Sequence, residues 1–280
     1  ADKGIAGVRM EYRLIRHGGN FKNVFPDVMD AVDFIRKKAR ELNLDFTRVG
    51  LAGGSAGGHL SSLVAQATPE CIVYDGFNGL FDAFERNGSA FGGGPFTGES
   101  EKEKKSASAI YQIRKNPPDT FLYHGSEDVT ITAIQSERFA EAIRKKGGKA
   151  EVLIYEGVGH SFFGKIQAHK DITTKALYDH VSYVFGMNKN RPKVKDYALP
   201  PHIAKQIPGF DIQGDWLEEK KKKWKLGFLE KGLTSTKGTV WEKRYGSYYI
   251  KWKGGTQAKI TIISPTKIKI RASVMNKVMK

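Results

Sequence analysis

The sequence predicts an α/β protein, in which a mostly parallel sheet flanked by helices is followed by a small C-terminal antiparallel β domain. Two observations lead to this prediction. Across the first 187 residues, short apolar runs alternate with segments of helical spacing, as in a parallel sheet covered on both faces. Beyond residue 188, apolar and basic residues alternate in short segments punctuated by glycines, which is typical of antiparallel strands with one wet face.

The charge of the chain changes at the same point. The 280 residues carry a net charge of +16, but residues 1–187 hold 24 Lys and Arg against 23 Asp and Glu. Residues 188–280 hold 22 Lys and Arg against 7 Asp and Glu. We therefore predict a first domain over residues 1–187, a proline-containing linker over 188–209 and a basic β-rich domain over 210–280.

Composition excludes several classes of protein. No apolar run approaches the roughly 20 residues that a membrane span needs, so we expect no membrane span. The single cysteine, Cys71, excludes an intramolecular disulfide and a cysteine-based metal cage, and we expect it to be a buried strand residue. We expect no metal and no cofactor.

Strands and helices are expected in alternation along the first domain. Helical spacing runs from Asp27 to Leu42, with Pro26 and three aspartates near its start. A long irregular stretch is expected over 76–118, with one short helix near 107–112. The remaining elements are strands at 5–12, 49–52, 71–75, 120–124 and 150–155, and helices after residue 55, at 134–146 and at 172–185.

Ser55 lies at the centre of the most informative segment, Gly53-Gly54-Ser55-Ala56-Gly57. An apolar strand precedes it and an apolar-periodic helix follows, which predicts a very tight turn with the serine at its apex. Small neighbours permit the close approach of strand and helix in such a turn. By itself the segment fits equally well a turn that binds phosphate or merely packs.

Two further motifs favour a catalytic interpretation. Asp128 follows the strand ending near His124, and His160 follows the strand ending at Tyr155. Residues just beyond the carboxyl ends of parallel strands converge on one edge of the sheet. We therefore predict a catalytic triad: Ser55 attacks an acyl carbon, His160 takes and returns the proton, and Asp128 orients the imidazole. The Ala56 backbone N–H is expected to donate to the oxyanion.

Each triad residue alone has a simpler explanation. Asp128 fits a strand-end cap for the next helix, and His160 fits an ordinary loop histidine. Their order along the chain, Ser then Asp then His, and their shared place at strand ends favour the triad over these explanations. His59, just inside the helix after Ser55, is expected to pack rather than to act as a second base.

Residues 1–187 resemble the esterase/lipase branch of the α/β-hydrolases, which includes hormone-sensitive-lipase-like and acetyl-xylan-esterase-like members. The resemblance rests on Glu11-Tyr12-Arg13-Leu14, Phe25-Pro26-Asp27-Val28, Asp45-Phe46-Thr47-Arg48-Val49-Gly50, Gly53-Gly54-Ser55-Ala56-Gly57-Gly58-His59-Leu60, His124-Gly125-x-x-Asp128 and Gly159-His160-x-Phe162. It implies hydrolysis of short-chain, acetyl-type esters without a cofactor. Several relatives remove acetyl or feruloyl groups from plant polysaccharides, so the expected substrate is a small-molecule or polysaccharide ester.

The chain departs from this family at the oxyanion loop. Family members carry a His-Gly-Gly motif before the strand that Tyr12 ends, whereas His17-Gly18-Gly19 follows that strand here. We interpret it as a loop near the substrate entrance and expect the natural N-terminus, with any signal peptide, to be missing. Localisation stays unknown, with a periplasmic or secreted protein favoured if a signal peptide was lost.

Substrate contacts are expected from residues next to the triad. Gly54 adjoins the serine, and Phe77 and Asn78 follow the strand after the elbow helix. Phe162 lies two residues beyond His160. For Phe77, Asn78 and Phe162, packing and turn roles are equally compatible with the sequence.

The basic domain suggests a partner of its own. Its lysines, arginines and aromatic residues suit an anionic or carbohydrate polymer, and the spacing of Trp216, Trp241 and Trp252 weakly resembles small lipocalin-like modules. Single-stranded nucleic acid is an alternative that no zinc, RRM or helix-turn-helix pattern supports. A solvated basic surface without a partner is the simplest explanation.

Taken together, the sequence predicts a serine carboxylesterase. A serine peptidase of the prolyl-oligopeptidase type is the competing enzyme, because it shares a similar elbow. A catalytically inert hydrolase-fold binding protein is the alternative from another class, because the oxyanion loop is absent from its expected place.

Overall fold

The computed structural model describes residues 4–84, 100–165 and 167–198, together with seven strands between residues 214 and 279. Four strands form a parallel sheet in the order β1-β2-β3-β4. They are β1 (Val49–Gly54), β2 (Cys71–Phe77), β3 (Asp119–Gly125) and β4 (Ala150–Tyr155). All four were predicted from apolar runs, and the bounds differ by no more than two residues. Cys71 is buried in β2, as expected.

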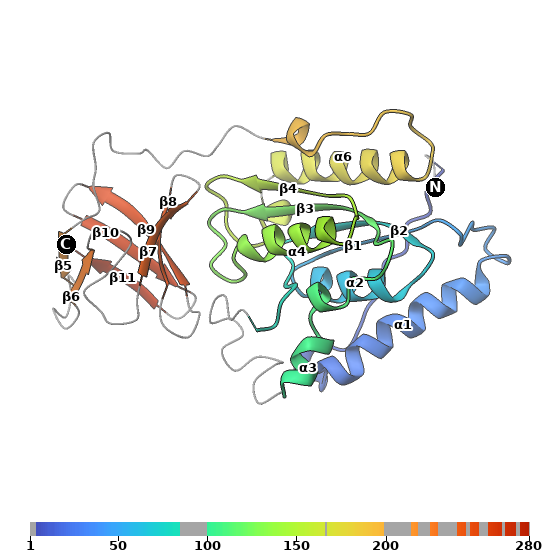
Figure 1. The fold of residues 1–280 in the computed structure, drawn as a ribbon, viewed down its shortest axis with the longest axis horizontal. Coiled ribbons are helices and arrows are strands. Elements are labelled where there is room, and N and C mark those ends of the chain that lie inside the picture. The colour runs from blue at the N-terminus through green and yellow to red at the C-terminus, as the bar shows by residue number, and fades with distance from the viewer. Residues whose placement is uncertain are drawn as a thin grey trace.

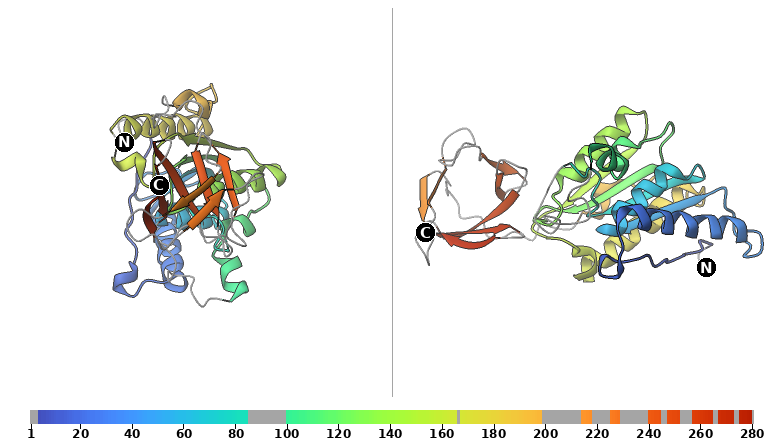
Figure 2. Two further views of the ribbon diagram at one scale, coloured as in Figure 1. Left: turned by 90° about the vertical axis from the view of Figure 1, so that its left-hand side faces the viewer. Right: turned by 90° about the horizontal axis from the view of Figure 1, so that it is seen from below.

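Helices cover both faces of this sheet. On one face, α2 (Ala56–Ala67) and α4 (Ile134–Lys145) enclose a core that contains Leu122 of β3. On the other face, α6 (Gln167–Val184) packs over Phe121 and Tyr123 of the same strand. Successive residues of a strand point to opposite faces, so β3 supplies both cores. Figures 1 and 2 show α4 and α6 on opposite sides of the sheet. The predicted α/β arrangement is therefore confirmed.

Helix α1 (Phe21–Lys38) lies outside α2 and packs valines at 24, 28 and 32 against Leu60 and Val64. It begins six residues before the predicted start at Asp27. The cause is a local cap, since the Asn23 side chain accepts a hydrogen bond from the Asn20 N–H at 2.8 Å. Pro26 therefore lies inside the helix and not at its first turn.

The prediction of a strand at residues 5–12 is wrong. Residues 5–14 have no regular secondary structure, and most of them are exposed. Met10 and Tyr12 pack against the valines of α1 and not in a strand ladder. An alternating apolar pattern becomes a strand only when a neighbouring strand pairs with it, and in the described sheet β1 pairs with β2 and not with residues 5–12.

The stretch between β2 and β3 also differs in detail from its prediction. The short helix expected near 107–112 is replaced by α3 (Glu101–Ser106) and a 3₁₀ turn at Ala109–Tyr111. Ser100 precedes α3 as its N-cap, and the side chains of Ser100 and Glu103 cap each other's backbone N–H groups. Residues 85–99 of this stretch lie outside the described residues.

The part of the structure built on the parallel sheet continues past residue 187. Val194 and Tyr197, in a short 3₁₀ helix, are buried in the core under α6. The Tyr155 hydroxyl donates to the Tyr197 carbonyl at 3.0 Å. The beginning of the predicted linker therefore packs on this unit, while residues 199–209 lie outside the described residues. The division of the chain into three parts stays a prediction.

Seven further strands are described in the basic part of the chain. Five form an antiparallel sheet in the order β11-β10-β9-β8-β7, and β5 pairs with β6. They are β5 (Gly214–Leu217), β6 (Lys225–Phe228), β7 (Val240–Arg244), β8 (Ser247–Lys251), β9 (Gln257–Ser264), β10 (Lys267–Ala272) and β11 (Met275–Met279). The connecting residues and all side chains of this part lie outside the described residues, so the small β domain stays a prediction.

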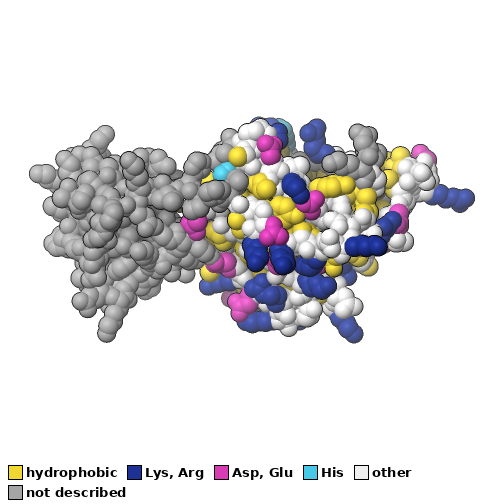
Figure 3. Space-filling view, turned by 90° about the horizontal axis from the view of Figure 1, so that it is seen from above, with side chains coloured by type: hydrophobic (Ala, Val, Ile, Leu, Met, Phe, Trp, Pro, Cys, Tyr) yellow, Lys and Arg dark blue, Asp and Glu magenta, His cyan; other side chains and the backbone are white. Residues whose placement is uncertain are grey.

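Charged side chains are mixed on the face that carries α6. Figure 3 shows basic and acidic side chains interspersed there, with apolar surface between them. Lys175 pairs with Asp179, and Arg191 pairs with Asp119 and Glu151. Among the described helices, none combines the length and the apolar character that crossing a membrane requires.

Candidate active site

Ser55 joins β1 to α2 in a strained backbone conformation. Its φ of 54° and ψ of −120° lie in a region that residues other than glycine rarely adopt. The Ser55 N–H donates to the Phe77 carbonyl at 2.9 Å, which ties the turn to the end of β2. The strand and helix approach so closely that a Cβ atom on Gly53 would lie 2.3 Å from the Gly57 carbonyl oxygen. Only glycine therefore fits at position 53, because any side chain there would collide with the backbone of Gly57.

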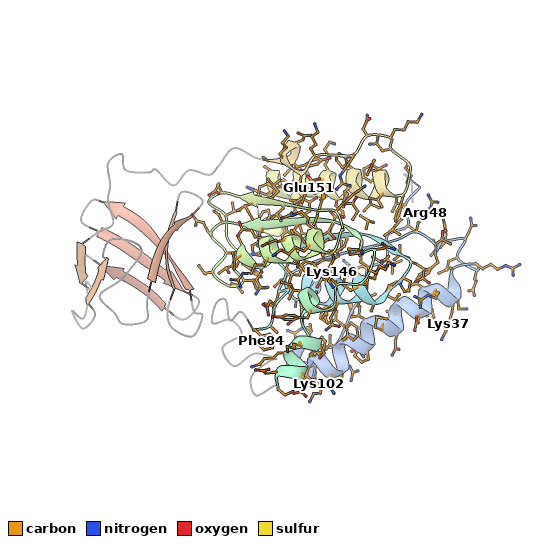
Figure 4. The ribbon with its side chains drawn as sticks, in the orientation of Figure 1. Lys37, Arg48, Phe84, Lys102, Lys146 and Glu151 are labelled. Carbon is orange, nitrogen blue, oxygen red and sulfur yellow. The ribbon has the colours of Figure 1, made fainter. Side chains whose placement is uncertain are left out.

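Three residues from three strand ends meet at this turn. The Ser55 Oγ lies 2.8 Å from Nε2 of His160, and Nδ1 of His160 lies 2.6 Å from Oδ2 of Asp128. Ser55 follows β1, Asp128 follows β3 and His160 follows β4. In Figure 4, Arg48, which immediately precedes β1, lies at the end of the sheet where this strand begins. Ser55, Asp128 and His160 follow the opposite, carboxyl ends of their strands.

Asp128 is held as a carboxylate by a dense set of donors. Its Oδ1 accepts the backbone N–H groups of Thr130 and Ile131, each at 2.9 Å. Its Oδ2 faces three side chains: His160, Asn78 at 2.7 Å and His124 at 3.3 Å. Burial opposes ionisation, but the hydrogen bonds and charges of His124 and His160 outweigh it and lower the pKa of Asp128 well below its usual range.

Exposure increases from the acid to the base. The Asp128 side chain is 0% exposed, whereas the His160 side chain is 19% exposed. A buried carboxylate on Nδ1 fixes the tautomer in which Nε2 is free to accept the Ser55 proton. The arrangement can therefore deprotonate a serine hydroxyl and stabilise the resulting imidazolium.

The expected oxyanion donor has a suitable position. Ala56 is the first residue of α2, so its N–H has no acceptor within the helix. The turn at His17-Gly18-Gly19 uses its donors differently, because the N–H groups of His17 and Gly19 both donate to the Leu14 carbonyl. These two N–H groups stabilise their own turn before α1.

The expected substrate contacts have different surroundings. Phe77 is 8% exposed and stacks on Tyr123 with centroids 4.7 Å apart, and Phe162 is 2% exposed within the same core. Asn78 is fully buried, and its side chain points to Asp128. Of these four, only Gly54 directly adjoins Ser55. Substrate binding by these four residues stays a prediction.

Three residues near the triad have roles that the sequence analysis did not assign. Half-buried Phe163 lies over Gly54, since a Cβ atom there would come within 2.4 Å of its Cζ. His124 faces Asp128, and Asn78 donates to it. Paired phenylalanines after His160 were visible in the sequence, but which ring faces the turn depends on α5 (Phe162–Lys165).

His59 packs, as the sequence predicts. Its Nε2 lies 2.6 Å from the Ala107 carbonyl oxygen, and it is buried beneath α3 and the following turn. Burial lowers its pKa, so the ring stays neutral and donates to this carbonyl. The residue links α2 to the segment before β3.

Two comparisons with known proteins identify the fold. The model of the prolyl oligopeptidase family matches residues 6–188. Among solved structures, Thermogutta terrifontis esterase 2 phosphonylated by cyclosarin has a TM-score of 0.51 and 25% sequence identity, over 65% of this chain and 71% of that chain. Together they confirm the predicted α/β-hydrolase fold.

Curated relatives are also named as esterases. The isoprenylcysteine alpha-carbonyl methylesterase ICME of Arabidopsis thaliana is 25% identical over 232 residues, which cover 72% of this chain and 53% of the relative. Esterase LipQ of Mycobacterium tuberculosis is 23% identical over 184 residues, covering 57% of this chain and 44% of the relative. The chain spans about half the length of the curated relatives it matches.

Proposed function

The chain belongs to the prolyl oligopeptidase family, and we propose that it is a serine hydrolase that cleaves carboxylic esters through an acyl-enzyme. The observation that carries the proposal is the pair of contacts on His160, 2.8 Å to the Ser55 hydroxyl and 2.6 Å to the Asp128 carboxylate. A hydroxyl hydrogen-bonded to an imidazole that a carboxylate orients is the arrangement that activates serine for acyl transfer.

The proposed reaction runs in two halves. His160 takes the Ser55 proton as Oγ attacks the ester carbonyl, and the Ala56 N–H donates to the oxygen that becomes negative. Collapse of this intermediate breaks the bond to the alcohol, which leaves with the proton from His160. Water then attacks the acyl-serine as His160 takes its proton. The bond between the acyl carbon and Oγ breaks, His160 returns the proton to Oγ, and the acid is released.

The favoured substrate is a short-chain ester, with acetyl groups on a small molecule or a carbohydrate as the first class to test. The half-buried ring of Phe163 beside Gly54 supports a small acyl group, because it occupies space next to the nucleophile. The relatives named methylesterases favour a second ester class, in which the leaving alcohol is methanol.

Peptide hydrolysis is the second candidate function, and the name of the matching family favours it. The chemistry differs only in the leaving group, which is an amine and needs the proton from His160 more strongly than an alcohol does. The ratio of amide to ester turnover on substrates with the same acyl group therefore separates the two functions.

The test uses the chain with a fluorophosphonate probe and matched substrates. Intact mass should show one adduct on the wild-type chain and none on Ser55→Ala. Turnover is then compared on p-nitrophenyl acetate, on an S-alkylcysteine methyl ester, and on the p-nitroanilide and the p-nitrophenyl ester of one peptide, which share their acyl group. Ester turnover that Ser55→Ala abolishes supports the proposal, faster amide cleavage favours the peptidase, and a folded chain that neither labels nor turns over contradicts both.

For the basic part of the chain we propose an anionic or carbohydrate polymer as partner. The support is its excess of 22 Lys and Arg over 7 Asp and Glu in residues 188–280. Gel-shift titration with acidic xylan, neutral xylan and single-stranded DNA tests it. Binding that salt weakens indicates an anionic polymer, and no retardation by any polymer indicates a solvated surface.

A further inference from the structure

The end of β2 connects the nucleophile to the acid of the triad. The Phe77 carbonyl accepts the Ser55 N–H at 2.9 Å, and the N–H of the next residue, Asn78, donates to the Tyr123 carbonyl at 2.9 Å. The Asn78 side chain then donates to Oδ2 of Asp128 at 2.7 Å. Two adjacent residues therefore fix both the turn after β1 and the loop after β3.

The sheet order explains why this segment has such a position. Strand β2 lies between β1 and β3, so its carboxyl end separates Ser55 from Asp128. Asn78 turns away from the strand with a φ of 50°, a left-handed conformation that asparagine tolerates better than most residues. The turn directs its amide toward Asp128 and not along the sheet.

The contact reaches the same carboxylate oxygen that His160 uses. Oδ1 of Asp128 is occupied by two backbone N–H groups, whereas Oδ2 is shared by Asn78, His160 and, at 3.3 Å, His124. A donor on Oδ2 draws negative charge away from the His160 side and holds the carboxylate in one orientation. The position and the strength of the Asp128–His160 contact therefore depend on Asn78.

Burial makes this dependence strong. Asn78 is 0% exposed, so solvent does not compete for its amide, and Oδ1 of the same side chain is buried without a hydrogen-bond partner among the described residues. A buried amide whose NH2 group is directed at a carboxylate is committed to that contact, because solvent cannot replace it. This arrangement points to a function in the triad rather than to packing alone.

We propose that Asn78 is a positioning residue that sets the orientation of Asp128 and the proton affinity of His160. The inference rests on the proposed function for its effect on turnover, but its effect on His160 is independent of activity. Without the Asn78 donor, Oδ2 keeps more negative charge for the imidazolium, so the pKa of His160 rises. The orientation of the imidazole toward Ser55 also becomes less fixed, so kcat falls.

The primary experiment is an NMR titration of the His160 ring protons in the wild-type chain and in Asn78→Gly. Glycine is chosen because it adopts positive φ without strain. We expect the pKa of His160 to rise by roughly half a unit to one unit in the variant. An unchanged pKa of His160 in a folded Asn78→Gly would overturn the inference, whether or not the chain is an esterase.

Kinetics provide the second readout. If the wild-type chain hydrolyses esters, we expect kcat in Asn78→Gly to fall about 10- to 100-fold with little change in KM. A fall of this size corresponds to the loss of one hydrogen bond to a charged group. The acid limb of the pH profile should move up with the pKa of His160. Wild-type chain without ester turnover contradicts the proposed function alone, and the titration still decides on Asn78.

Gln135→Ala is the matched control. Gln135 is also a buried amide, but it holds the backbone of Phe81 and Asp82 rather than the triad. Its replacement should lower the melting temperature and leave the pKa of His160 unchanged. If Asn78→Gly does not fold, Asn78→Ala also removes the amide donor while keeping a Cβ atom in the site. It should raise the pKa of His160 in the same way, and no rise there overturns the inference.

Discussion

Gly54 lies directly beneath the ring of Phe163, so that a Cβ atom on the glycine would come within 2.4 Å of the ring's Cζ. The ring in turn lies 5.3 Å from that of Phe77, at an angle of 50°. Because Gly54 immediately precedes Ser55, this contact makes an aromatic wall beside the proposed nucleophile. The wall belongs to α5, two residues after Ser161, which adopts a φ of 60°.

Replacing Phe163 by alanine should widen the acyl specificity. The half-buried ring takes up space next to Ser55, so its removal should favour longer acyl groups. We expect kcat/KM for p-nitrophenyl octanoate, divided by kcat/KM for p-nitrophenyl acetate, to rise about tenfold, which is the effect of burying one or two more methylenes. The matched control is Phe139→Ala, at a position that is 0% exposed in the core beneath α4. This change should cost about 3–5 kcal/mol of stability and leave the ratio unchanged. An unchanged ratio in Phe163→Ala would contradict a wall at the acyl site.

The glycines of the turn should differ sharply in their tolerance of alanine. A Cβ on Gly53 would lie 2.3 Å from the Gly57 carbonyl oxygen, which is backbone and cannot move aside, whereas a Cβ on Gly57 would meet nothing within 4 Å. Gly53→Ala should therefore destabilise the chain by several kcal/mol and abolish fluorophosphonate labelling. Gly57→Ala should be stable, with a gain of up to about 1 kcal/mol from its position in α2.

Urea denaturation of both variants measures this difference. Similar midpoints for Gly53→Ala and Gly57→Ala would mean that the strand and the helix do not approach as closely as the structure indicates.

The strain at Ser55 should appear as a gain in stability when it is relieved. A φ of 54° with a ψ of −120° costs about 1–3 kcal/mol for a residue with a Cβ atom, and glycine avoids this cost. Allowing about 0.5–1 kcal/mol for the extra flexibility of glycine in the unfolded chain, we expect Ser55→Gly to raise the free energy of unfolding by about 1 kcal/mol. Ser55→Ala removes the hydroxyl but keeps the strain.

Both variants should lose all labelling by the fluorophosphonate, so only the stability distinguishes them. Chemical denaturation at one pH gives the two free energies of unfolding. Equal values would show that the turn is not strained in solution.

Local patterns in the sequence were sufficient to predict that Ser55, Asp128 and His160 lie together. Ser55, Asp128 and His160 each follow an apolar run, and parallel strands necessarily bring such positions to one edge. The structure places the three within hydrogen-bond distance, while their catalytic role is the proposal tested above. The same apolar runs predicted β1 to β4 and the two faces of the sheet.

Contacts between distant segments could not be read from local pattern. The segment at 5–12 has the composition of a strand, but Met10 and Tyr12 pack on α1 because no ladder accepts them. Asn78 was expected at the substrate because it follows a strand. Its contact with Asp128 could not be predicted, because a φ of 50° turns the side chain inward and this angle depends on how β2 meets its neighbours.

The opposite face of the sheet carries a buried charge cluster that should make stability depend on pH. His180 of α6 is completely buried, with Nδ1 2.9 Å from an Asp75 oxygen and Nε2 3.2 Å from an Asp119 oxygen. Its ring stacks on Phe121 with centroids 3.7 Å apart. Arg191 pairs with Asp119 from the other side. The cluster therefore joins α6 to β2 and β3.

Burial alone would lower the pKa of His180, but the charges and hydrogen bonds of Asp75 and Asp119 outweigh it and raise this pKa to about 9. A histidine whose pKa is raised by folding contributes stability that is complete below its unfolded pKa near 6.5. That contribution is lost as the pH rises through about 9. At 1.36 kcal/mol per pKa unit, the free energy of unfolding should fall by about 3 kcal/mol across this window.

Urea denaturation at steps between pH 6 and pH 9.5 measures the decline, with His180→Gln as the comparison. The variant should be less stable at pH 6 by about 3–5 kcal/mol, because Asp75 and Asp119 lose their buried partner. Its stability should also stay nearly level from pH 6.5 to pH 9, since the titrating group is gone. A variant that keeps the wild-type slope would show that another group titrates, and His180 would then be neutral between its two aspartates.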